Sequence, residues 1–394
     1  MRVLFVSPNV PWPPDSGGRI RTFELLKALG SQCDLELWCV AEPRDLEQAH
    51  LELENAVKAV QIFPRSELPW HLRHLRTKPE RWFHSRPLIE ALERRVRVDP
   101  PDVLHADELL LARSLPADFA ERTVIHHHKL DLELAQHLED DGAAPAYVRM
   151  KRRLQTRLTA RLERYAAEHF KRHVVCSPED QALLAGRHAD LRISSVPSGF
   201  DAERFAPNPA VERAPGELLF LGTLSYEPNL DGLEWFAANV WDDLRQRHPD
   251  LVLRIVGREP GRRAHALLRP GMQLVGPVDD PLPDLWRASA LLVPLRIGGG
   301  TRLKITEALG AGTPVLSTSI GAEGLGLEDQ RHLLLADDAP AFAAAVERLV
   351  SDPGLGARLA TEGRGFALEH LSWPVLGQRL LRAWAGQRNR NQRG

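Results

Sequence analysis

Short apolar runs alternate with amphipathic stretches along nearly the whole chain. In the first half the runs lie at residues 2–8, 34–40, 57–64, 101–107, 122–128 and 173–178. In the second half they lie at residues 217–224, 251–257, 272–278, 290–295, 314–319 and 332–337. Continuous apolar runs of this length, separated by stretches with helical spacing, are typical of buried parallel strands joined by crossover helices. The pattern predicts an α/β protein built from repeated βαβ units.

Residues 196–217, "VPSGFDAERFAPNPAVERAPGE", interrupt this rhythm and are rich in Pro, Gly and Ala. We interpret them as an interdomain linker. A chain of 394 residues is long for one core, so two doubly wound domains are expected. We place an N-terminal domain at 1–200, a second domain at 201–370, and a final amphipathic helix with a tail at 371–394. Ligands bind beyond the carboxyl ends of parallel strands, so the loops after the strands are where chemistry is expected.

The composition narrows the class of protein. The net charge of −2 gives no global basicity of the kind that indicates nucleic-acid binding. The chain has three cysteines without CxxC spacing, which fits a reducing compartment. The first apolar run is too short for a signal peptide, and none of the runs approaches the ~20 residues of a membrane span. We expect a cytoplasmic protein, with peripheral membrane contact as the alternative considered below.

A glycine cluster at 298–300 follows the apolar run "ALLVPL". Glycines permit close approach of a ligand to the backbone, and we expect Thr301 to cap a following helix whose free N–H groups would bind an anion. Arg302 and Lys304 would add positive charge. Lys304 and Glu307 share one helical face, which places a carboxylate one turn beyond the cations. The alternative, to which the residues alone give equal weight, is a glycine turn followed by an exposed Lys–Glu pair.

A second glycine loop follows the first apolar run. Gly17 and Gly18 precede a helix expected to begin near Arg19, and they would present backbone donors at the end of the first strand. The spacing is not GxGxxG, so a dinucleotide site is not indicated. Arg19 and Arg21 are expected to be surface residues of the helix.

Three consecutive histidines end another apolar run. Strand alternation places His126 and His128 on one face and His127 on the other. Adjacent strand residues cannot all converge on one metal ion, so we do not expect a zinc site. A single histidine at the carboxyl end of the strand is the better candidate, as a hydrogen-bond donor or proton carrier. The alternative, a packed histidine, applies most strongly to His127.

Two segments are rich in cations. Residues 68–98 mix Trp and Phe with Arg and Lys, and residues 147–172 read as a strongly basic helix. Such segments are usually solvated faces. The alternative is contact with an anionic membrane or with a lipid-phosphate acceptor.

The stretch "VPLRIGGGTRLKITEALGAGTPVLSTSIGAEGL" resembles the donor-site motif of glycosyltransferase family 4, in the branch that reads G-x-G-T-R-x-K-x-x-E-A. "FVSPNVPWPPDSGGRIRTFELLKAL", "VPSGFDAERFAP", "LLFLGTLSYEPNLDGLEWF" and "SWPVLGQRLLRAW" resemble further segments of that family. The resemblance implies the GT-B fold, in which two Rossmann-like domains face a central cleft and a C-terminal helix crosses back to the first domain. It also implies transfer of a hexose from a UDP- or GDP-sugar to a hydroxyl acceptor, with retention at the anomeric carbon.

The resemblance also assigns roles to residues. Glu307 would bind the ribose, and Val278 and Asp279 would meet the nucleobase. His128 would be the catalytic histidine, with His126 as the second choice. The residues that would bind the donor diphosphate are Gly17, Gly18, Gly299, Gly300, Thr301, Arg302 and Lys304.

Two departures from the family pattern stand out. Gly299 takes the place of the first carboxylate of the Glu-x7-Glu motif. Thr223 and Pro228 take the places of an Arg and a Lys that many relatives carry. The charge of the diphosphate would then be met chiefly by Arg302 and Lys304.

The implied partners are a nucleotide-sugar donor, bound by the second domain, and a hydroxyl acceptor, bound by the N-terminal domain. The acceptor would be lipid-linked or a growing glycan, as in the synthesis of cell-surface polysaccharides and glycoconjugates. We expect neither a cofactor nor a metal ion, since the cations already supply positive charge. Two alternatives remain: a nucleotide-sugar epimerase or hydrolase of the same fold, and a catalytically silent subunit that binds a nucleotide sugar.

Overall fold

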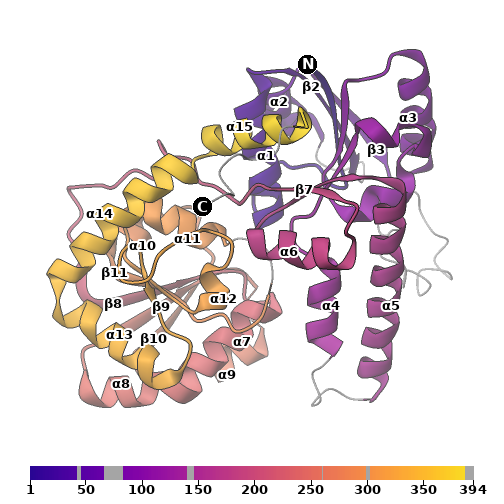
Figure 1. Cartoon of the computed structure of the whole chain (residues 1–394). Helices are drawn as coiled ribbons and strands as arrows, with labels where there is room; N and C mark the ends of the chain where they lie inside the picture. Colours follow the sequence, from indigo (N-terminus) through magenta and orange to yellow (C-terminus); the bar gives the residue numbers. More distant parts are fainter. Residues whose placement is uncertain (42–45, 66–82, 140–145, 260, 299–301, 387–394) are drawn as a thin grey trace. The chain divides into compact units, whose positions relative to one another are not determined.

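The chain divides into two compact units, shown in the computed structural model of Figure 1. One contains Met1–Pro197 and Leu376–Gly394, and the other contains Ser198–Val375. The structure describes residues 1–41, 46–65, 83–139, 146–259, 261–298 and 302–386. The unit boundaries at 197/198 and 375/376 fall within a few residues of the positions at which the sequence divided the chain.

Within its described residues, the N-terminal unit holds a seven-stranded parallel sheet in the order β3-β2-β1-β4-β5-β6-β7. The strands are β1 (Arg2–Ser7), β2 (Asp34–Ala41), β3 (Ala59–Pro64), β4 (Val103–Ala106), β5 (Thr123–His126), β6 (Arg172–Val175) and β7 (Arg192–Ser195). The chain runs outward from β1 to β3 and then returns to the other side of β1. This order creates a topological switch point between β1 and β4, beside which ligands bind in such sheets.

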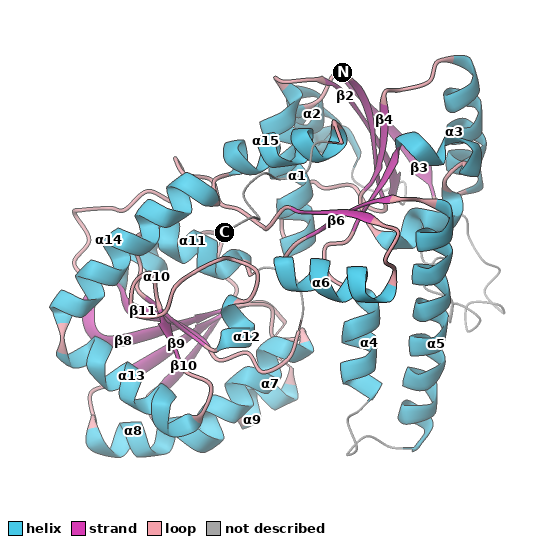
Figure 2. Ribbon diagram, in the orientation of Figure 1, coloured by secondary structure: helices cyan, strands magenta, loops and turns pink. Residues whose placement is uncertain are grey.

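Helices pack around this sheet (Figure 2). They are α1 (Gly17–Gly30), α2 (Leu46–Ala56), α3 (Arg86–Val98), the 3₁₀ helices η3 (Leu109–Ser114) and η4 (Ala117–Arg122), α4 (Asp131–Glu139), α5 (Ala146–His169) and α6 (Pro178–Arg187). Strand residues Leu4 and Val6 pack with Leu88 and Leu92 of α3 in one apolar core. The amphipathic stretches therefore bury their apolar faces on the sheet.

The C-terminal unit repeats this architecture, with six parallel strands among its described residues in the order β10-β9-β8-β11-β12-β13. The strands are β8 (Ala214–Leu221), β9 (Val252–Val256), β10 (Met272–Gly276), β11 (Ala288–Val293), β12 (Val315–Ser317) and β13 (Leu334–Leu335). The helices are α7 (Glu227–Phe236), the π-helix η5 (Ala237–Trp241), α8 (Asp242–Arg247), α9 (Arg262–Ala266), α10 (Leu282–Arg287), α11 (Leu303–Gly310), α12 (Ser319–Ala322), α13 (Ala339–Ser351) and α14 (Pro353–His370). A last helix, α15 (Trp373–Trp384), begins in this unit. The switch point of this sheet lies between β8 and β11.

Strand β8 shows why its sequence reads as a continuous apolar run. Leu218 and Phe220 pack into a core on one face of the sheet. Leu219 and Leu221 pack into a second core on the other face. A parallel strand covered on both faces has no polar side, so the run lacks the alternation of a half-exposed strand. The prediction of two parallel-sheet, Rossmann-like domains is confirmed.

Helix α15 ends in the N-terminal unit, although in the sequence it directly follows the helices of the C-terminal unit. Residues from Leu376 onward belong to the N-terminal unit. There Gly377 lies against Ala28 of α1, and Arg172 donates hydrogen bonds to the last carbonyl groups of α15, those of Ala383 and Trp384. The predicted return of the C-terminal helix to the first domain is confirmed.

Three local expectations are corrected. Helix α1 begins at Gly17, so Gly17 and Gly18 form its first turn and are not a preceding loop. Arg302 occupies the N-cap position of α11, so the expected cap at Thr301 is wrong by one residue. Strand β7 was not predicted because it is short and polar, "RISS", and lies at an edge of the sheet.

Candidate functional site

The N-terminal unit has a polar pocket of about 280 Å³ beside its switch point. It is bounded by the loop after β1, the first turn of α1 and the residues that follow β4 and β5. The residues that line it include Gly18, Arg19, Thr22, Asp107, Glu108 and His128. Predicted site residues His128 and Gly18 thus lie at one pocket, where a Cβ built on Gly18 would be 3.6 Å from Nδ1 of His128.

His128 and Asp107 form the central polar pair of this pocket. Nε2 of His128 lies 2.8 Å from Oδ1 of Asp107, and Thr22 donates its hydroxyl proton to Oδ2 at 2.5 Å. Burial lowers the pKa of His128, but the charge of Asp107, its hydrogen bond and Glu108 together raise that pKa above its ordinary value. Burial opposes the ionisation of Asp107, yet His128 and His126 hold its pKa well below the usual range. Asp107 therefore favours the protonated form of His128.

Strand alternation separates the three histidines as predicted. His126 and His128 both face Asp107, whereas Nε2 of His127 lies 2.8 Å from Nδ1 of His173 on the other face. His127 is buried in the protein interior, which is the alternative that the sequence favoured for this histidine. His126 is fully buried behind the pocket, while the side chain of His128 retains 14% of its exposure. His128 is accordingly the histidine that a ligand in this pocket would contact.

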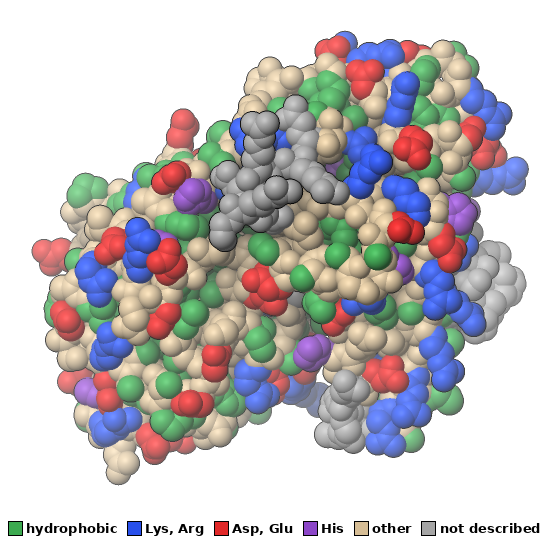
Figure 3. Space-filling model, viewed as in Figure 1, with side chains coloured by type: hydrophobic (Ala, Val, Ile, Leu, Met, Phe, Trp, Pro, Cys, Tyr) green, Lys and Arg blue, Asp and Glu red, His purple; other side chains and the backbone are tan. Residues whose placement is uncertain are grey.

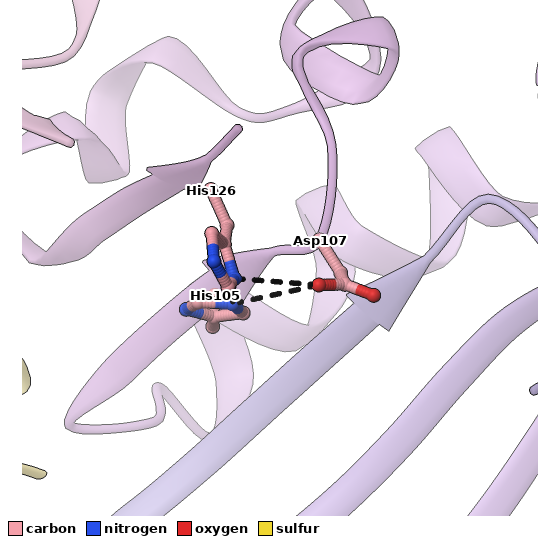
Figure 4. Close-up of side chains that lie close together, drawn as sticks. All are labelled: His105, Asp107 and His126. Atoms are coloured by element: carbon pink, nitrogen blue, oxygen red, sulfur yellow. Dashed lines mark hydrogen bonds and ion pairs between the residues drawn. The ribbon is translucent and has the colours of Figure 1, made fainter. Parts of the chain in front are cut away.

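Behind the pocket, His105, Asp107 and His126 come close enough to share a metal ion (Figure 4). Nε2 of His105 and Nδ1 of His126 lie 3.2 Å apart and face Oδ1 of Asp107 at 4.0 and 3.4 Å. Burial lowers the pKa of His105 to about 3 and that of His126 well below its ordinary value, so both rings are neutral. The question is which nitrogen of each ring carries the proton.

Two donors on the outer side of these rings settle that question. Trp384 of α15 donates its indole N–H to Nδ1 of His105 at 2.9 Å. Arg21 donates to Nε2 of His126 at 2.9 Å. Because neither donor can accept a proton, the inner nitrogen of each neutral ring carries the proton. Nδ1 of His126 directs its proton toward Asp107 at 3.4 Å, whereas Nε2 of His105 lies beyond hydrogen-bond distance of that carboxylate. A metal-binding histidine instead donates its outer N–H to a partner. These residues therefore fit a hydrogen-bonded network and do not fit a metal ion.

Arg21 corrects a further expectation. It is buried, with 2% of its surface exposed, and it bonds to His126 and to the carbonyl oxygen of Val196. Arg19, by contrast, lines the pocket and forms an ion pair with Asp15 at 3.0 Å. The sequence placed both arginines on the helix surface, but the turn of α1 sends Arg21 inward to the network behind the pocket.

A second group of predicted residues lies at the switch point of the C-terminal unit. Nζ of Lys304 donates to Oδ1 of Asn229 at 2.8 Å and lies 4.6 Å from the centre of the Phe220 ring. Gly222, which follows β8, approaches so closely that a Cβ there would lie 2.9 Å from this nitrogen. Within the described part of the chain Lys304 has no carboxylate within ion-pair distance. The interpretation as an exposed Lys–Glu pair is wrong.

Burial dominates the electrostatics of Lys304 and Glu307. Burial, together with the charge of Arg302, lowers the pKa of Lys304 to about 7, although the charge of Glu307 opposes the shift. Burial likewise raises the pKa of Glu307 to about 7, against the charges of Arg204 and Lys304. Neither group keeps its ordinary charge at neutral pH, and an anion bound beside Lys304 would restore the proton of that lysine.

The remaining predicted residues have different outcomes. Gly299, Gly300 and Thr301 lie outside the described residues. Arg302 lies beside Gly298, where a φ of 120° favours glycine and a Cβ would lie 3.0 Å from the Arg302 guanidinium. Val278 and Asp279 lie exposed between β10 and α10.

Sequence reasoning missed Asp107, Glu108 and Asn229. Asp107 and Glu108 directly follow the apolar run that became β4, and β4 pairs with β5, the strand that ends in His126. The rule that singled out His128, namely that functional groups follow the carboxyl ends of strands, applies equally to these two acids. Asn229 lacked any such signal, because it lies in the first turn of α7 and meets Lys304 only through the fold.

Comparison with known proteins agrees with this architecture. Residues 16–204 match the family model "Glycosyltransferase Family 4", and residues 215–352 match the model "Glycosyl transferases group 1". A GDP-mannose-dependent alpha-(1-6)-phosphatidylinositol monomannoside mannosyltransferase from Mycolicibacterium smegmatis is 26% identical over 225 residues, which is 51% of this chain and 58% of that protein. An uncharacterized 44.6 kDa protein from the cps region of Klebsiella pneumoniae is 30% identical over 135 residues, 32% of this chain and 35% of that protein. The chain thus spans only about a third to three fifths of these two relatives.

Solved structures share the fold at low identity. The sucrose-phosphate synthase of Thermosynechococcus elongatus superimposes with a TM-score of 0.73 at 18% identity, covering 98% of this chain and 99% of that one. HepE of Anabaena in complex with UDP gives a TM-score of 0.66 at 15% identity, covering 98% of this chain and all of that one. By its fold and by both domain matches, the chain is a two-domain protein of the GT-B glycosyltransferase family 4 type.

Proposed function

We propose that this protein transfers a hexose from a nucleotide diphosphate sugar to a hydroxyl acceptor, with retention at the anomeric carbon. The C-terminal unit would bind the donor and the N-terminal unit the acceptor. The observation that carries the proposal is Lys304, a partly buried lysine at a switch point that contacts the Asn229 amide and an aromatic ring. A cation kept without a carboxylate among the described residues suits an anionic ligand, here the donor diphosphate.

The chemistry of the donor site follows from its residues. Arg302 and Lys304 would neutralise the departing diphosphate, together with the free N–H groups at the start of α11 and the backbone of Gly299, Gly300 and Thr301. Glu307, one turn along α11, would accept hydrogen bonds from the ribose hydroxyls. Val278 and Asp279 would meet the base. Since the cations supply the positive charge, the proposal includes neither a metal ion nor another cofactor.

In the N-terminal unit, His128 would be the catalytic residue. Its imidazole, held by Asp107, can donate a hydrogen bond to a sugar hydroxyl. Gly17 and Gly18 form the exposed first turn of α1, and their N–H groups would contact the diphosphate. The helix is 14 residues long, so its N-terminal dipole is fully developed.

The names of similar proteins support the choice of donor. Structures of HepE from Anabaena contain UDP, UDP with glucose, or UDP-glucose. The mycobacterial relative is named as GDP-mannose-dependent. We therefore propose a UDP- or GDP-hexose as donor, and a role in the synthesis of a cell-surface glycan, polysaccharide or glycoconjugate.

The basic helix α5 supports a proposal about the acceptor. Tyr147, Met150 and Leu154 are exposed at 72%, 71% and 45%, and their spacing places them on one helical face. Lys and Arg side chains gather along the same helix (Figure 3). An apolar ridge between cations suits an anionic membrane surface or a lipid-linked acceptor.

Residues 68–82 of the other basic segment lie outside the described residues. None of the helices in the described part of the chain is long and apolar enough to cross a bilayer.

The test is direct titration followed by turnover. UDP and GDP are titrated calorimetrically into the wild-type protein and Lys304→Met, and a panel of UDP- and GDP-hexoses is then incubated with a cell lipid extract, with products identified by mass spectrometry. The proposal expects binding of one nucleotide, weakened in the variant, and a glycosylated product whose anomeric configuration matches the donor. Turnover of the nucleotide sugar without an acceptor would favour the epimerase or hydrolase alternative. Binding without turnover would favour the silent subunit.

A further inference from the structure

Glu108 has a backbone conformation that is nearly reserved for glycine. Its φ is 154° and its ψ is 149°. In this region the Cβ of any other residue is crowded by the backbone, so a non-glycine residue is strained there. Residues held in such conformations cluster at functional sites.

The neighbours of Glu108 impose this conformation. The backbone N–H of Asp107 donates to the carbonyl oxygen of Val6 at 2.8 Å, which fixes the chain at the end of β4. Directly afterwards, Leu109 and Leu111 of η3 are buried in the core. Because both flanks are anchored, residue 108 must absorb the change of direction. A glycine would do so without strain, so the glutamate side chain has a use beyond the fold.

The side chain reaches the pocket. Glu108 is a lining residue with 29% of its side chain exposed. Its Oε1 lies 3.8 Å from Nδ1 of His128, which is too far for a hydrogen bond. Nδ1 of His128 is itself buried without a hydrogen-bond partner among the described residues. The two groups leave room for one polar group of a ligand between or beside them.

The charge state of Glu108 suits a neutral ligand group. Burial raises the pKa of this carboxyl group to about 7, the charge of His128 opposes the shift, and Asp131 and Asp107 add to it. Near neutral pH the group exists in both forms, and it can accept or donate a hydrogen bond. A hydroxyl group, which also does both, is the complementary partner.

The rest of the lining favours an uncharged ligand. Ser7, Asn9 and Ser16 offer hydroxyl and amide groups, and Arg19 is already paired with Asp15. A phosphate group would meet the carboxylates of Asp107 and Glu108 in a small space, and like charges repel strongly there. A neutral polyhydroxylated molecule would instead find donors and acceptors on several sides.

We propose that Glu108 recognises a hydroxyl group of the acceptor, and that the acceptor portion bound in this pocket is a neutral polyol that carries no phosphate. This inference rests on the proposed function, because it names the acceptor class of that reaction. Glu108 is a binding and specificity residue in this account, while His128 remains the catalytic one.

Two variants test this role. Glu108→Gln keeps the strained backbone and removes the charge, whereas Glu108→Gly removes both the side chain and the strain. We expect a Tm several degrees above wild type for Glu108→Gly and no increase for Glu108→Gln. Gln330→Gly, at a residue with φ of 64° in the other unit, controls for a general effect of glycine at a left-handed residue. A fall in Tm for Glu108→Gly would overturn the inference, because the glutamate would then be serving the fold.

Ligand binding supplies the second readout. Methyl α-D-glucopyranoside, methyl α-D-mannopyranoside, myo-inositol and glucose 6-phosphate are titrated into each protein and followed by NMR. We expect a neutral polyol to bind the wild type more tightly than the phosphorylated sugar. Its affinity should be reduced at least about tenfold in Glu108→Gly and by less in Glu108→Gln, whose amide still donates and accepts hydrogen bonds. Tighter binding of the phosphorylated sugar, or unchanged polyol affinity in the variants, would overturn the inference.

Nucleotide binding separates this inference from the proposed function. Calorimetric titration with UDP and GDP should give the same affinity for wild type, Glu108→Gln and Glu108→Gly, since Glu108 is not among the residues proposed to bind the donor. If the wild type binds a polyol through Glu108 but binds neither nucleotide, the proposed transferase activity fails while the polyol site stands. If nucleotide binds and polyol recognition is absent, only the acceptor assignment fails.

Discussion

Nε2 of His128 lies 2.8 Å from Oδ1 of Asp107, a residue 21 positions earlier in the chain. The contact forms because β4 and β5 are parallel neighbours, so the residues that follow them emerge at the same edge of the sheet. Asp107 also accepts a hydrogen bond from Thr22 and lies near the inner ring nitrogens of His126 and His105, at 3.4 and 4.0 Å. A single buried carboxylate thus orients the histidine of the pocket and raises its pKa.

Replacing Asp107 by Asn should disable His128 without emptying the pocket. The amide has the same size but no charge, so the pKa of His128 should fall and its protonated fraction at neutral pH should drop. We expect transferase turnover to decrease by about 100-fold or more, a range typical of lost acid–base assistance. Imidazole ¹⁵N NMR across a pH titration measures the pKa directly. The exposed Asp118→Asn serves as control, and an unchanged His128 pKa in Asp107→Asn would contradict the assignment.

Replacing Lys304 by Met should weaken nucleoside diphosphate binding. A charge-assisted hydrogen bond contributes about 1.5–3 kcal/mol, so affinity should fall about 10- to 100-fold. Because burial places the lysine pKa at about 7, binding of the diphosphate at pH 8 should also take up close to one proton in the wild type. Calorimetry in buffers of different ionisation enthalpy measures this uptake, which Lys304→Met should lack. Lys58→Met, at an exposed lysine paired with Asp34, should retain it.

Glu307 and Lys304, which are both partly buried, predict opposite effects of pH on the stability of the protein. For Glu307 the native pKa of about 7 exceeds the unfolded value of 4.5, so the native state binds more protons between these limits and stability falls as pH rises from 4.5 to 7. For Lys304 the native pKa of about 7 lies below 10.5, so the unfolded state binds more protons and stability rises between pH 7 and 10.5. Denaturant unfolding across this range should show the first slope reduced in Glu307→Gln and the second in Lys304→Met. Parallel profiles for wild type and variants would refute the burial of these charges.

Trp384→Phe should loosen the network behind the pocket. Phenylalanine keeps most of the packing but removes the N–H that donates to His105, which frees that ring to change tautomer. Loss of one buried hydrogen bond costs about 0.5–1.5 kcal/mol, or about 1–6 °C in Tm for a domain of this size. Differential scanning calorimetry and ¹⁵N NMR of the histidines provide the measurement. Trp286→Phe, which removes an indole bond to Ala206 in the other unit, should lower stability without altering the histidine signals.

The basic helix α5 predicts a charge-dependent interaction with membranes. Replacing Lys151 and Arg157 together by Gln should reduce binding to vesicles that contain phosphatidylglycerol by about 30-fold, since each cation near an anionic surface contributes about 1 kcal/mol. Vesicles of phosphatidylcholine alone should bind weakly in all cases. Arg94→Gln with Arg97→Gln on α3 is the matched control. Equal sedimentation with both kinds of vesicle would argue against an electrostatic contact.

The sequence predicted the features that depend on neighbouring residues. Apolar runs such as 217–224 marked the strands because a buried strand needs an unbroken apolar stretch, and residues 373–384 gave the bounds of α15 correctly. The same local reading placed His128 after a strand and found the Gly-rich segment with Arg302 and Lys304. Resemblance to a known family then supplied roles that the residue pattern had left open.

Other features of the candidate sites depend on residues far apart in the chain. Trp384 meets His105 across 279 positions, and Lys304 meets Asn229 across 75. Such contacts are set by strand order and by the return of α15, and hydrophobic periodicity carries no information about either. The sequence also placed Arg21 on the surface, because a charged residue in a helix is usually solvated; the structure buries it against His126.

By itself, then, the sequence determined most of the strands and helices, since these follow from local patterns of burial and backbone freedom. Only the tertiary structure decided which polar groups meet. It paired Asp107 with His128 and held Glu108 in a conformation suited to glycine. It also placed Lys304 beyond ion-pair distance of the carboxylates in the described part of the chain. The physical reason is that burial and long-range contacts set the pKa, the tautomer and the strain of a residue, and these quantities exist only once distant segments have packed together.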